Sequence, residues 1–209
     1  MTAGVFISLE GGEGTGKSTQ SKALSEKLEQ KGYTVTVTRE PGGTASAEVI
    51  RELLLTGAEE KWGIRTEAML FAAARAEHCA KLIRPALVRG EWVICDRFID
   101  SSRAYQIVNR ELTDTDILAL HAIGSRNLMP HRTFVLDLPE AVAAKRAAAR
   151  DRGDSDRIGG RDSSYHQAVI ANFRQFAADE PDRVRLIDAS RAVEEITATL
   201  LASLNDLMS

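Results

Sequence analysis

The segment LEGGEGTGKST, residues 9–19, constrains the fold more than any other part of the chain. It follows the apolar run VFISL, and it precedes a stretch in which apolar residues recur at helical spacing. Four of its eleven residues are glycine, a density that weakens any regular element. Such a loop is useful where a ligand must come very close to the backbone. The segment therefore predicts a strand, a tight ligand-binding loop and a helix, in that order.

The spacing within this segment matches the phosphate-binding P-loop pattern, from Gly11 through Gly16 to Lys17 and Ser18. In such a loop the backbone N–H groups turn inward around phosphate oxygens, and the helix N-terminus adds its positive dipole end. Lys17 would contact the β- and γ-phosphates, and the Ser18 hydroxyl would bind Mg²⁺. The alternative is an ordinary glycine-rich turn capped by Ser18. The predicted ATP-binding residues are Gly11, Gly12, Glu13, Gly14, Thr15, Gly16, Lys17, Ser18 and Thr19.

Apolar runs alternate with helical patterns along the chain. The predicted strands are residues 5–9, 33–38, 91–95, 132–138 and 183–188. The predicted helices are residues 17–31, 45–55, 66–83, 101–108, 114–123, 140–150, 164–178 and 193–207. This alternation predicts an α/β fold with a five-stranded parallel sheet and helices on both faces, in one domain spanning residues 1–209. Ligands in such folds bind beyond the carboxyl ends of the strands.

Composition and charge narrow the possible partners. Hydrophobic residues make up 44% of the chain and charged residues 27%, with a net charge of −3. We therefore expect no nucleic-acid partner and no membrane association, since no general basic field is present. Cys79 and Cys95 form no metal-ligand spacing and no disulfide framework, which fits a cytoplasmic location. No NKxD motif occurs, so the chain is not a GTPase of the translation type.

Three further sequence clusters predict a binding site for a second ligand. TREPGG places Arg39 at the end of the second predicted strand, and CDRFIDSSRAYQ places Asp96 and Arg97 at the end of the third. EAMLFAAARAEH places Phe71 and Arg75 four residues apart, on one helix face. An aromatic ring beside a forked guanidinium suits a flat heterocycle with a carbonyl edge.

Together with the P-loop, these segments resemble the thymidylate kinase family, over nearly the whole chain. The resemblance rests on EGGEGTGKST, TREPGGT, LFAAARAEH, DRFIDSSRAYQ, VLDL and KRAAARDRGDSDRI. It implies a P-loop kinase fold with a short lid at about residues 150–161. It also implies transfer of the γ-phosphoryl group of ATP to dTMP for dTTP synthesis, with Mg²⁺ as cofactor, in a homodimer.

The resemblance also implies roles for individual residues. Arg39 and Arg97 would hold the phosphate of dTMP. Phe71 would stack on thymine, and Arg75 would donate to its O4. The remaining predicted dTMP contacts are Glu13 at the 3′-hydroxyl, Arg51 in the pocket wall, Ser102 and Gln106 at the base, and Tyr105 against C2′. Asp96 would hold Mg²⁺ through water, next to Ser18.

An acceptor phosphate is already anionic, so catalysis rests on positioning and charge neutralisation. The family has one form with an arginine inside the P-loop and another with an arginine in the lid. Here Gly14 and Thr15 carry no charge, so the chain resembles the lid-arginine form. The predicted catalytic residues are Lys17, Asp96, Arg97, Arg150 and Arg157.

Two stretches depart from the family pattern. IVNREL follows AYQ where glycines are expected, and in the lid segment DRIGGRD an isoleucine follows DR where the family usually has an acidic residue. Two alternatives therefore stay open: a kinase of another nucleotide, and a nucleotide-binding regulator that has lost turnover. His78, His121, His131 and His166 have no paired spacing and are interpreted as structural or surface residues.

The lid interpretation predicts that Arg150→Ala or Arg157→Ala lowers kcat steeply and leaves dTMP affinity nearly intact, because a lid arginine acts mainly in the transition state. Arg152→Ala should be milder, since its neighbours can partly substitute. Steady-state kinetics and dTMP titrations check this. If all three variants keep kcat within about threefold of the parent, under ~1 kcal/mol, the cation must come from Arg97 or Arg161.

Overall fold

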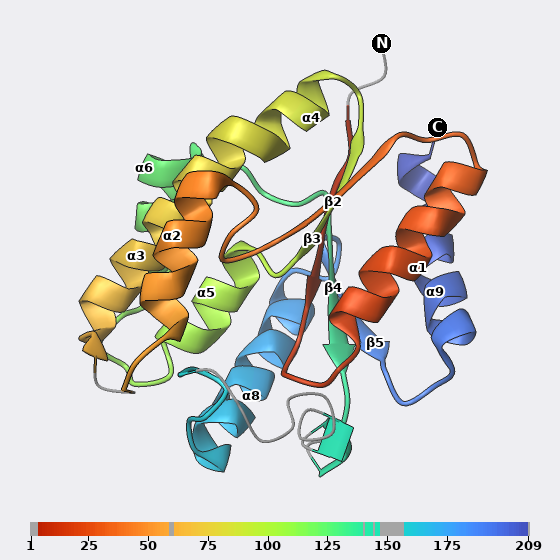
Figure 1. The fold of residues 1–209 in the computed structure, drawn as a ribbon. Coiled ribbons are helices and arrows are strands. Elements are labelled where there is room, and N and C mark those ends of the chain that lie inside the picture. Colours follow the sequence, from red (N-terminus) through yellow and green to blue (C-terminus); the bar gives the residue numbers. More distant parts are fainter. Residues whose placement is uncertain (1–3, 59–60, 140, 144, 147–156, 209) are drawn as a thin grey trace.

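The structure is a computed structural model that describes residues 4–58, 61–139, 141–143, 145–146 and 157–208. Its centre is a five-stranded parallel sheet in the order β2-β3-β1-β4-β5 (Figure 1). The strands are β1 Phe6–Glu10, β2 Val35–Arg39, β3 Trp92–Asp96, β4 Arg132–Asp137 and β5 Val184–Asp188. The predicted α/β class, strand number and parallel direction are confirmed.

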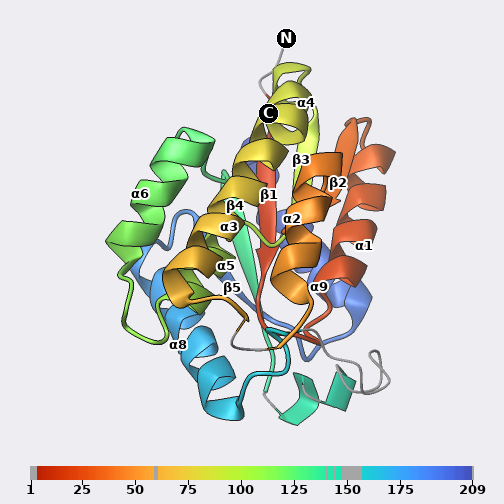
Figure 2. The same cartoon turned by 60° about the vertical axis from the view of Figure 1, so that its left-hand side comes forward.

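Helices cover both faces of this sheet, as predicted (Figures 1 and 2). They are α1 Lys17–Gln30, α2 Ala45–Leu55, α3 Ile64–His78, α4 Arg84–Val88, α5 Ile99–Gln106, α6 Asp114–Ser125, α8 Ser163–Asp179 and α9 Val193–Ala202. α1 and α9 pack together on one face, and α3, α5 and α8 lie on the other. Among the described residues, no helix is both long and apolar enough to cross a bilayer.

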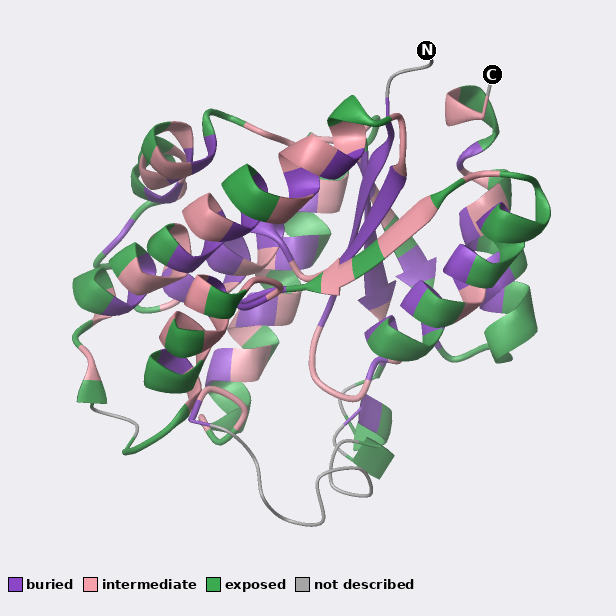
Figure 3. Cartoon of the chain, turned by 45° about the horizontal axis from the view of Figure 1, so that its top comes forward, coloured by how far each residue is buried: buried purple, intermediate pink, exposed green. Residues whose placement is uncertain are grey.

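Strand alternation explains this layering. Ile7 and Leu9 of β1 join Leu24 of α1 and Leu200 of α9 in one buried cluster. Phe6, which directly precedes Ile7, packs on the opposite face with residues of α3, β3 and α6. Successive side chains of a strand point to opposite faces, so a strand buried on both sides is mostly apolar. β1 also buries the polar residues Ser8 and Glu10. Figure 3 shows the central strands buried and β2, at the edge, partly exposed.

One predicted helix differs from the structure. The pattern over residues 66–83 predicts a continuous helix, but α3 ends at His78 and a π-helical stretch, Cys79–Ile83, leads into α4. Pro85 lies at the start of α4 and has no N–H to donate to the preceding turn, which accounts for the irregular hydrogen bonding. The predicted helix 140–150 lies partly outside the described residues.

The register of the strands positions the candidate site. Leu9 pairs with Asp96, and Asp96 pairs with Arg39 on the other side. The carboxyl ends of β1, β3 and β2 are therefore level, which brings the P-loop, the Asp96–Arg97 pair and Arg39 to one edge of the sheet.

A buried ion network anchors α5, the helix that follows Arg97. Asp100 is fully buried, and its carboxylate accepts hydrogen bonds from Arg103, Arg183 and Thr133 at 2.6–2.9 Å. The two arginines favour the charged form and hold the pKa of Asp100 below its usual value, although burial alone would raise it. The network ties α5 to β4 and to the start of β5.

Replacing Asp100 by Ala would leave two arginines without their shared buried counter-ion. Both arginines keep Glu180 as a partner, and Arg103 also keeps Asp114, but these carboxylates are about one-third exposed. Loss of the fully buried partner should therefore cost about 3 kcal/mol, the lower end for breaking a buried ion pair. Urea unfolding followed by circular dichroism measures it. Asp188→Ala, which removes an exposed pairing with Arg191, is the matched control and should change little. A loss under about 1 kcal/mol for Asp100→Ala would contradict the anchoring role.

Candidate active site

A cavity of about 570 Å³ opens at the carboxyl edge of the sheet. Its wall runs from the P-loop and the first turn of α1, past Asp96 and Arg97, to α3 and α5. The predicted site residues that line it are Glu13, Gly14, Thr15, Gly16, Lys17, Ser18, Thr19, Arg39, Arg51, Phe71, Arg75, Asp96, Arg97, Ser102, Tyr105 and Gln106. Gly11 and Gly12 lie in the loop itself. The cavity therefore brings together both groups of predicted residues.

The P-loop conformation depends on its glycines. Gly16 precedes α1 with a φ of 94°, and Gly11 has a φ of 128°. A Cβ at Gly11 would lie 2.5 Å from the carbonyl oxygen of Leu136 in β4. Both positions thus require glycine, for backbone conformation at Gly16 and additionally for close packing at Gly11.

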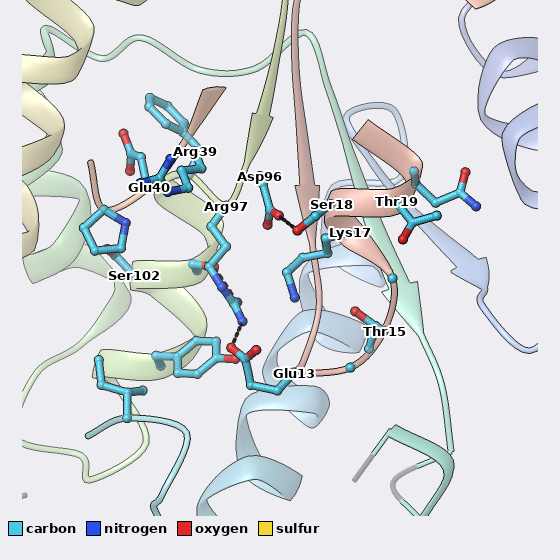
Figure 4. Close-up of a pocket in the computed structure, with 18 of the residues that line it drawn as sticks. Glu13, Thr15, Lys17, Ser18, Thr19, Arg39, Glu40, Asp96, Arg97 and Ser102 are labelled. Carbon is cyan, nitrogen blue, oxygen red and sulfur yellow. Dashed lines mark hydrogen bonds and ion pairs between the residues drawn. The ribbon is translucent and has the colours of Figure 1, made fainter. Parts of the chain in front are cut away.

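Lys17 lies under the loop, buried, and its Nζ donates to the carbonyl oxygens of Gly12 at 2.6 Å and Gly11 at 3.2 Å. Burial, with the positive charge of Arg97, lowers the pKa of Lys17 to about 8. Figure 4 shows Lys17 and Arg97 pointing into the same space between the P-loop and α5. Two cations this close are a strong site for the phosphate groups of a ligand.

Ser18 and Asp96 form the candidate metal site. The Ser18 hydroxyl donates to Asp96 Oδ2 at 2.6 Å (Figure 4). A hydroxyl and a carboxylate are hard oxygen donors of the kind Mg²⁺ prefers, usually with several retained waters and substrate phosphates. The described residues contain no cluster of three or more histidine, cysteine or acidic side chains suited to a metal. The residues present therefore fit a Mg²⁺ ion carried by a nucleotide.

Arg97 has a left-handed backbone, with φ 69°. Its guanidinium donates to Gly11 O at 3.0 Å and to Ser101 Oγ at 3.2 Å, and it pairs with Glu13 at 2.5 Å. The Tyr105 ring lies 5.2 Å from it. Arg97 thereby connects the P-loop to α5.

Glu10, the last residue of β1, is hydrogen-bonded to the segment that follows Arg97. It accepts from the backbone N–H of Phe98 at 2.7 Å and from the Ser101 hydroxyl at 2.6 Å. Its complete burial, with the charge of Asp100 nearby, raises its pKa to about 8. Sequence analysis assigned no role to Glu10 or Ser101, because their function depends on the pairing of β1 with β3.

Phe71, Arg75, Ser102 and Gln106, the residues predicted to contact the base, all line the cavity. Phe71 is half-buried and belongs to none of the three core clusters of the described residues, in contrast to Phe98. Both amide atoms of Gln106 are buried without a hydrogen-bond partner in the described part of the chain. Unpaired buried polar atoms in a cavity wall indicate a polar ligand.

Other predicted residues make protein contacts around this cavity. Arg39 is half-exposed and pairs with Glu48, and Arg51 donates to Pro41 O. Arg157 donates to Leu54 O at 2.7 Å and pairs with Glu67, so its side chain is buried and is not part of the cavity wall. Arg150 and Arg152 lie outside the described residues.

Sequence analysis missed Arg146 and Arg191, which also line the cavity. Arg191 follows β5, so the rule that ligands bind beyond the carboxyl ends of strands could have identified it. Arg146 falls in an alanine-rich segment that gave no such signal.

The raised pKa of Glu10 predicts a pH dependence of stability. Between about pH 4.5 and 8 the unfolded chain loses the Glu10 proton while the folded protein keeps it, so the stability that Glu10 contributes is lost as pH rises. Glu10→Gln stays neutral and lacks this loss. As pH rises, the free energy of unfolding of the variant should therefore increase relative to that of the parent, by roughly 1 kcal/mol per pH unit. Urea unfolding of both proteins across this range measures it, and parallel pH curves would contradict it.

Comparisons with known proteins agree with this geometry. The family model for thymidylate kinase matches residues 9–200. A thymidylate kinase of Rhizorhabdus wittichii is 53% identical over 98% of this chain and 99% of its own length. That of Caulobacter vibrioides is 45% identical over 96% of this chain and 95% of its own length. The crystal structure of the Ehrlichia chaffeensis thymidylate kinase covers 97% of this chain and 99% of its own, with 30% identity and a TM-score of 0.77. The chain therefore belongs to the thymidylate kinase family.

Proposed function

We propose that the protein transfers the γ-phosphoryl group of ATP to dTMP and releases dTDP and ADP. The observation that carries this is that the P-loop and the Phe71–Arg75 pair line one and the same cavity. A triphosphate at the P-loop and a pyrimidine beside Phe71 would place their phosphates between Lys17 and Arg97. Family membership gives the same activity.

The donor side is built from the P-loop. Its N–H groups and Lys17 bind the β- and γ-phosphates, and Ser18 and Asp96 hold the ion. Mg²⁺, when bound, neutralises negative charge on the phosphates of ATP. Arg146 and Arg191 line the same cavity and add positive charge to its wall.

The acceptor side uses the opposite wall. Arg39 and Arg97 hold the dTMP phosphate, and Glu13, which pairs with Arg97, faces the 3′-hydroxyl. Tyr105 lies against C2′ and disfavours a ribose hydroxyl. The base stacks on Phe71 and accepts a hydrogen bond from Arg75, with Ser102 and Gln106 at its polar edge and Arg51 in the wall.

Catalysis follows from charge and position. The acceptor phosphate needs no base to remove a proton, so the side chains act as cations that neutralise the transferring group. Lys17 and Arg97 are the proposed cations for this role, since both line the cavity. Arg150 of the lid remains the proposed additional cation, while Arg157 would first have to leave Glu67.

We also propose a homodimer in the cytoplasm. Met69 on α3 and Ile123 on α6 are large apolar side chains that are 52% and 83% exposed, and α3 packs against α6. A second copy covering this region would remove them from water. The cytoplasmic location is supported by two buried cysteines that are both free thiols.

A coupled assay of ADP release tests the activity. We expect ATP turnover that depends on dTMP and is much slower with dCMP, dGMP or thymidine. Faster turnover with another nucleotide would favour a different nucleotide kinase. Binding of ATP and dTMP without any turnover would favour a regulatory paralogue, the alternative prompted by IVNREL and RIGGRD.

Phe71→Ala should weaken dTMP far more than ATP, because stacking on a base is worth ~1–3 kcal/mol. This corresponds to roughly a tenfold to hundredfold rise in the Kd for dTMP, measured by calorimetry. Equal losses for both nucleotides would mean that Phe71 supports the fold and does not contact the base.

A further inference from the structure

A buried chain of hydrogen bonds lies behind the base side of the cavity. Thr38 Oγ1 lies 2.8 Å from His78 Nε2, and His78 Nδ1 lies 3.0 Å from Glu40 Oε1. Arg75 Nε donates to the other carboxylate oxygen, Oε2, at 2.7 Å. The side chains of Arg75, His78 and Glu40 are at most 4% exposed. The chain therefore runs from β2, beside the phosphate site, to the arginine that faces the base.

Three of the five N–H donors of Arg75 are occupied by this arrangement. Nε bonds to Glu40, and Nη2 donates to Phe98 O at 3.2 Å and to Ser102 Oγ at 2.8 Å. The Phe98 ring lies 5.3 Å from the guanidinium carbon. Among the described residues, Nη1 has no hydrogen-bond partner, and Arg75 lines the cavity. One edge of a fixed, planar donor is thus left for a ligand.

The pair of Glu40 and His78 fixes that edge. A carboxylate that accepts from Arg75 on one oxygen and from His78 on the other cannot rotate freely. Since Glu40 offers only acceptors, His78 donates to it from Nδ1, and Nε2 shares a hydrogen bond with the Thr38 hydroxyl. Gly43 makes room for this ring, because a Cβ there would lie 2.5 Å from Nε2.

This arrangement determines what the cavity accepts. A guanidinium has no acceptor, so its free edge pairs with a carbonyl oxygen and meets an amino group donor to donor. If Arg75 could rotate away, a pyrimidine with an amino group at C4 would bind almost as tightly as one with oxygen at C4. If Arg75 is held in place, the amino group and the guanidinium both stay unpaired. The preference for the oxo pyrimidine over the amino pyrimidine is then large.

We propose, on the basis of the proposed function, that Glu40 and His78 are positioning residues that set the preference for a pyrimidine with oxygen at C4. They act through Arg75: His78 is not part of the cavity lining, and Glu40, which lines the cavity, has its two carboxylate oxygens bonded to Arg75 and His78. Among the described residues neither side chain is hydrogen-bonded to Arg39, Lys17 or Arg97, so their loss should affect dTMP binding more than turnover.

Glu40→Gln tests the proposal, with dTMP, dUMP and dCMP as acceptors at saturating ATP. Glutamine keeps the shape but loses the charge and one acceptor. We expect the KM for dTMP to rise about tenfold with kcat within about threefold. The dTMP-to-dCMP ratio of kcat/KM should fall about tenfold, with dUMP following dTMP because it also carries O4.

Glu77→Gln is the matched control, since Glu77 precedes His78 on α3 but pairs at the surface with Lys81. Glu77→Gln should leave unchanged the KM for dTMP, the kcat and the dTMP-to-dCMP ratio of kcat/KM. His78 supplies a second pair of variants: in His78→Asn the amide can replace Nδ1 as donor to Glu40 and should keep the ratio. His78→Gln places its amide near Nε2 and should lower the ratio as Glu40→Gln does.

The outcomes separate the inference from the proposed function. If the parent protein does not phosphorylate dTMP, the proposed function fails. If the parent prefers dTMP to dCMP and both Glu40→Gln and His78→Gln keep that ratio, the positioning role is wrong and the function stands. Equal losses for dTMP and dCMP, accompanied by a lower melting temperature, would show that the pair only stabilises the fold.

Discussion

The pairing of β1 with β3 is the interaction on which the site depends. It sets Leu9 level with Asp96, so the P-loop and the Asp96–Arg97 pair leave the sheet side by side. The backbone N–H of Arg97 donates to Leu9 O at 2.9 Å, and that of Phe98 to Glu10. From this junction Ser18 reaches Asp96, and Arg97 reaches the P-loop carbonyl of Gly11. Main-chain hydrogen bonds thus define the distance between the donor and acceptor halves of the cavity.

Features that depend on neighbours in sequence could be predicted from the sequence. The P-loop is a contiguous motif, and buried parallel strands are continuous apolar runs, so the five strands and the α/β class followed directly. Buried polar networks could not be predicted, because their partners lie far apart in the chain. Glu40 and His78 are separated by 38 residues and Arg157 and Glu67 by 90, and nothing in the local pattern links them. His78 was interpreted only as structural or surface, since its proposed role depends on Glu40 and Arg75.

The contact between Arg157 and Glu67 bears on the lid. Glu67 is buried on α3, and it pairs with both Arg157 and Arg161, the latter beside the hydroxyl of Tyr165. Tyr165 in turn donates to the backbone of Tyr105, which lines the cavity. Arg157 and Arg161, which fall within the predicted lid segment, are therefore bonded to α3, and Arg161 is also bonded to α8. A role for Arg157 at the phosphates requires breaking a buried ion pair, which costs several kcal/mol as an order of magnitude.

A single cavity shared by both nucleotides implies direct transfer of the phosphoryl group, in line between donor and acceptor oxygens, with Lys17 and Arg97 as fixed cations. The stereochemical course at phosphorus tests this most directly. ATP made chiral at the γ-phosphorus with oxygen isotopes is turned over with dTMP, and the configuration of the product is determined. One direct displacement predicts inversion. Retention would require two displacements through a covalent phospho-enzyme, and it would contradict the account of a cavity that only positions its two ligands and neutralises their charge.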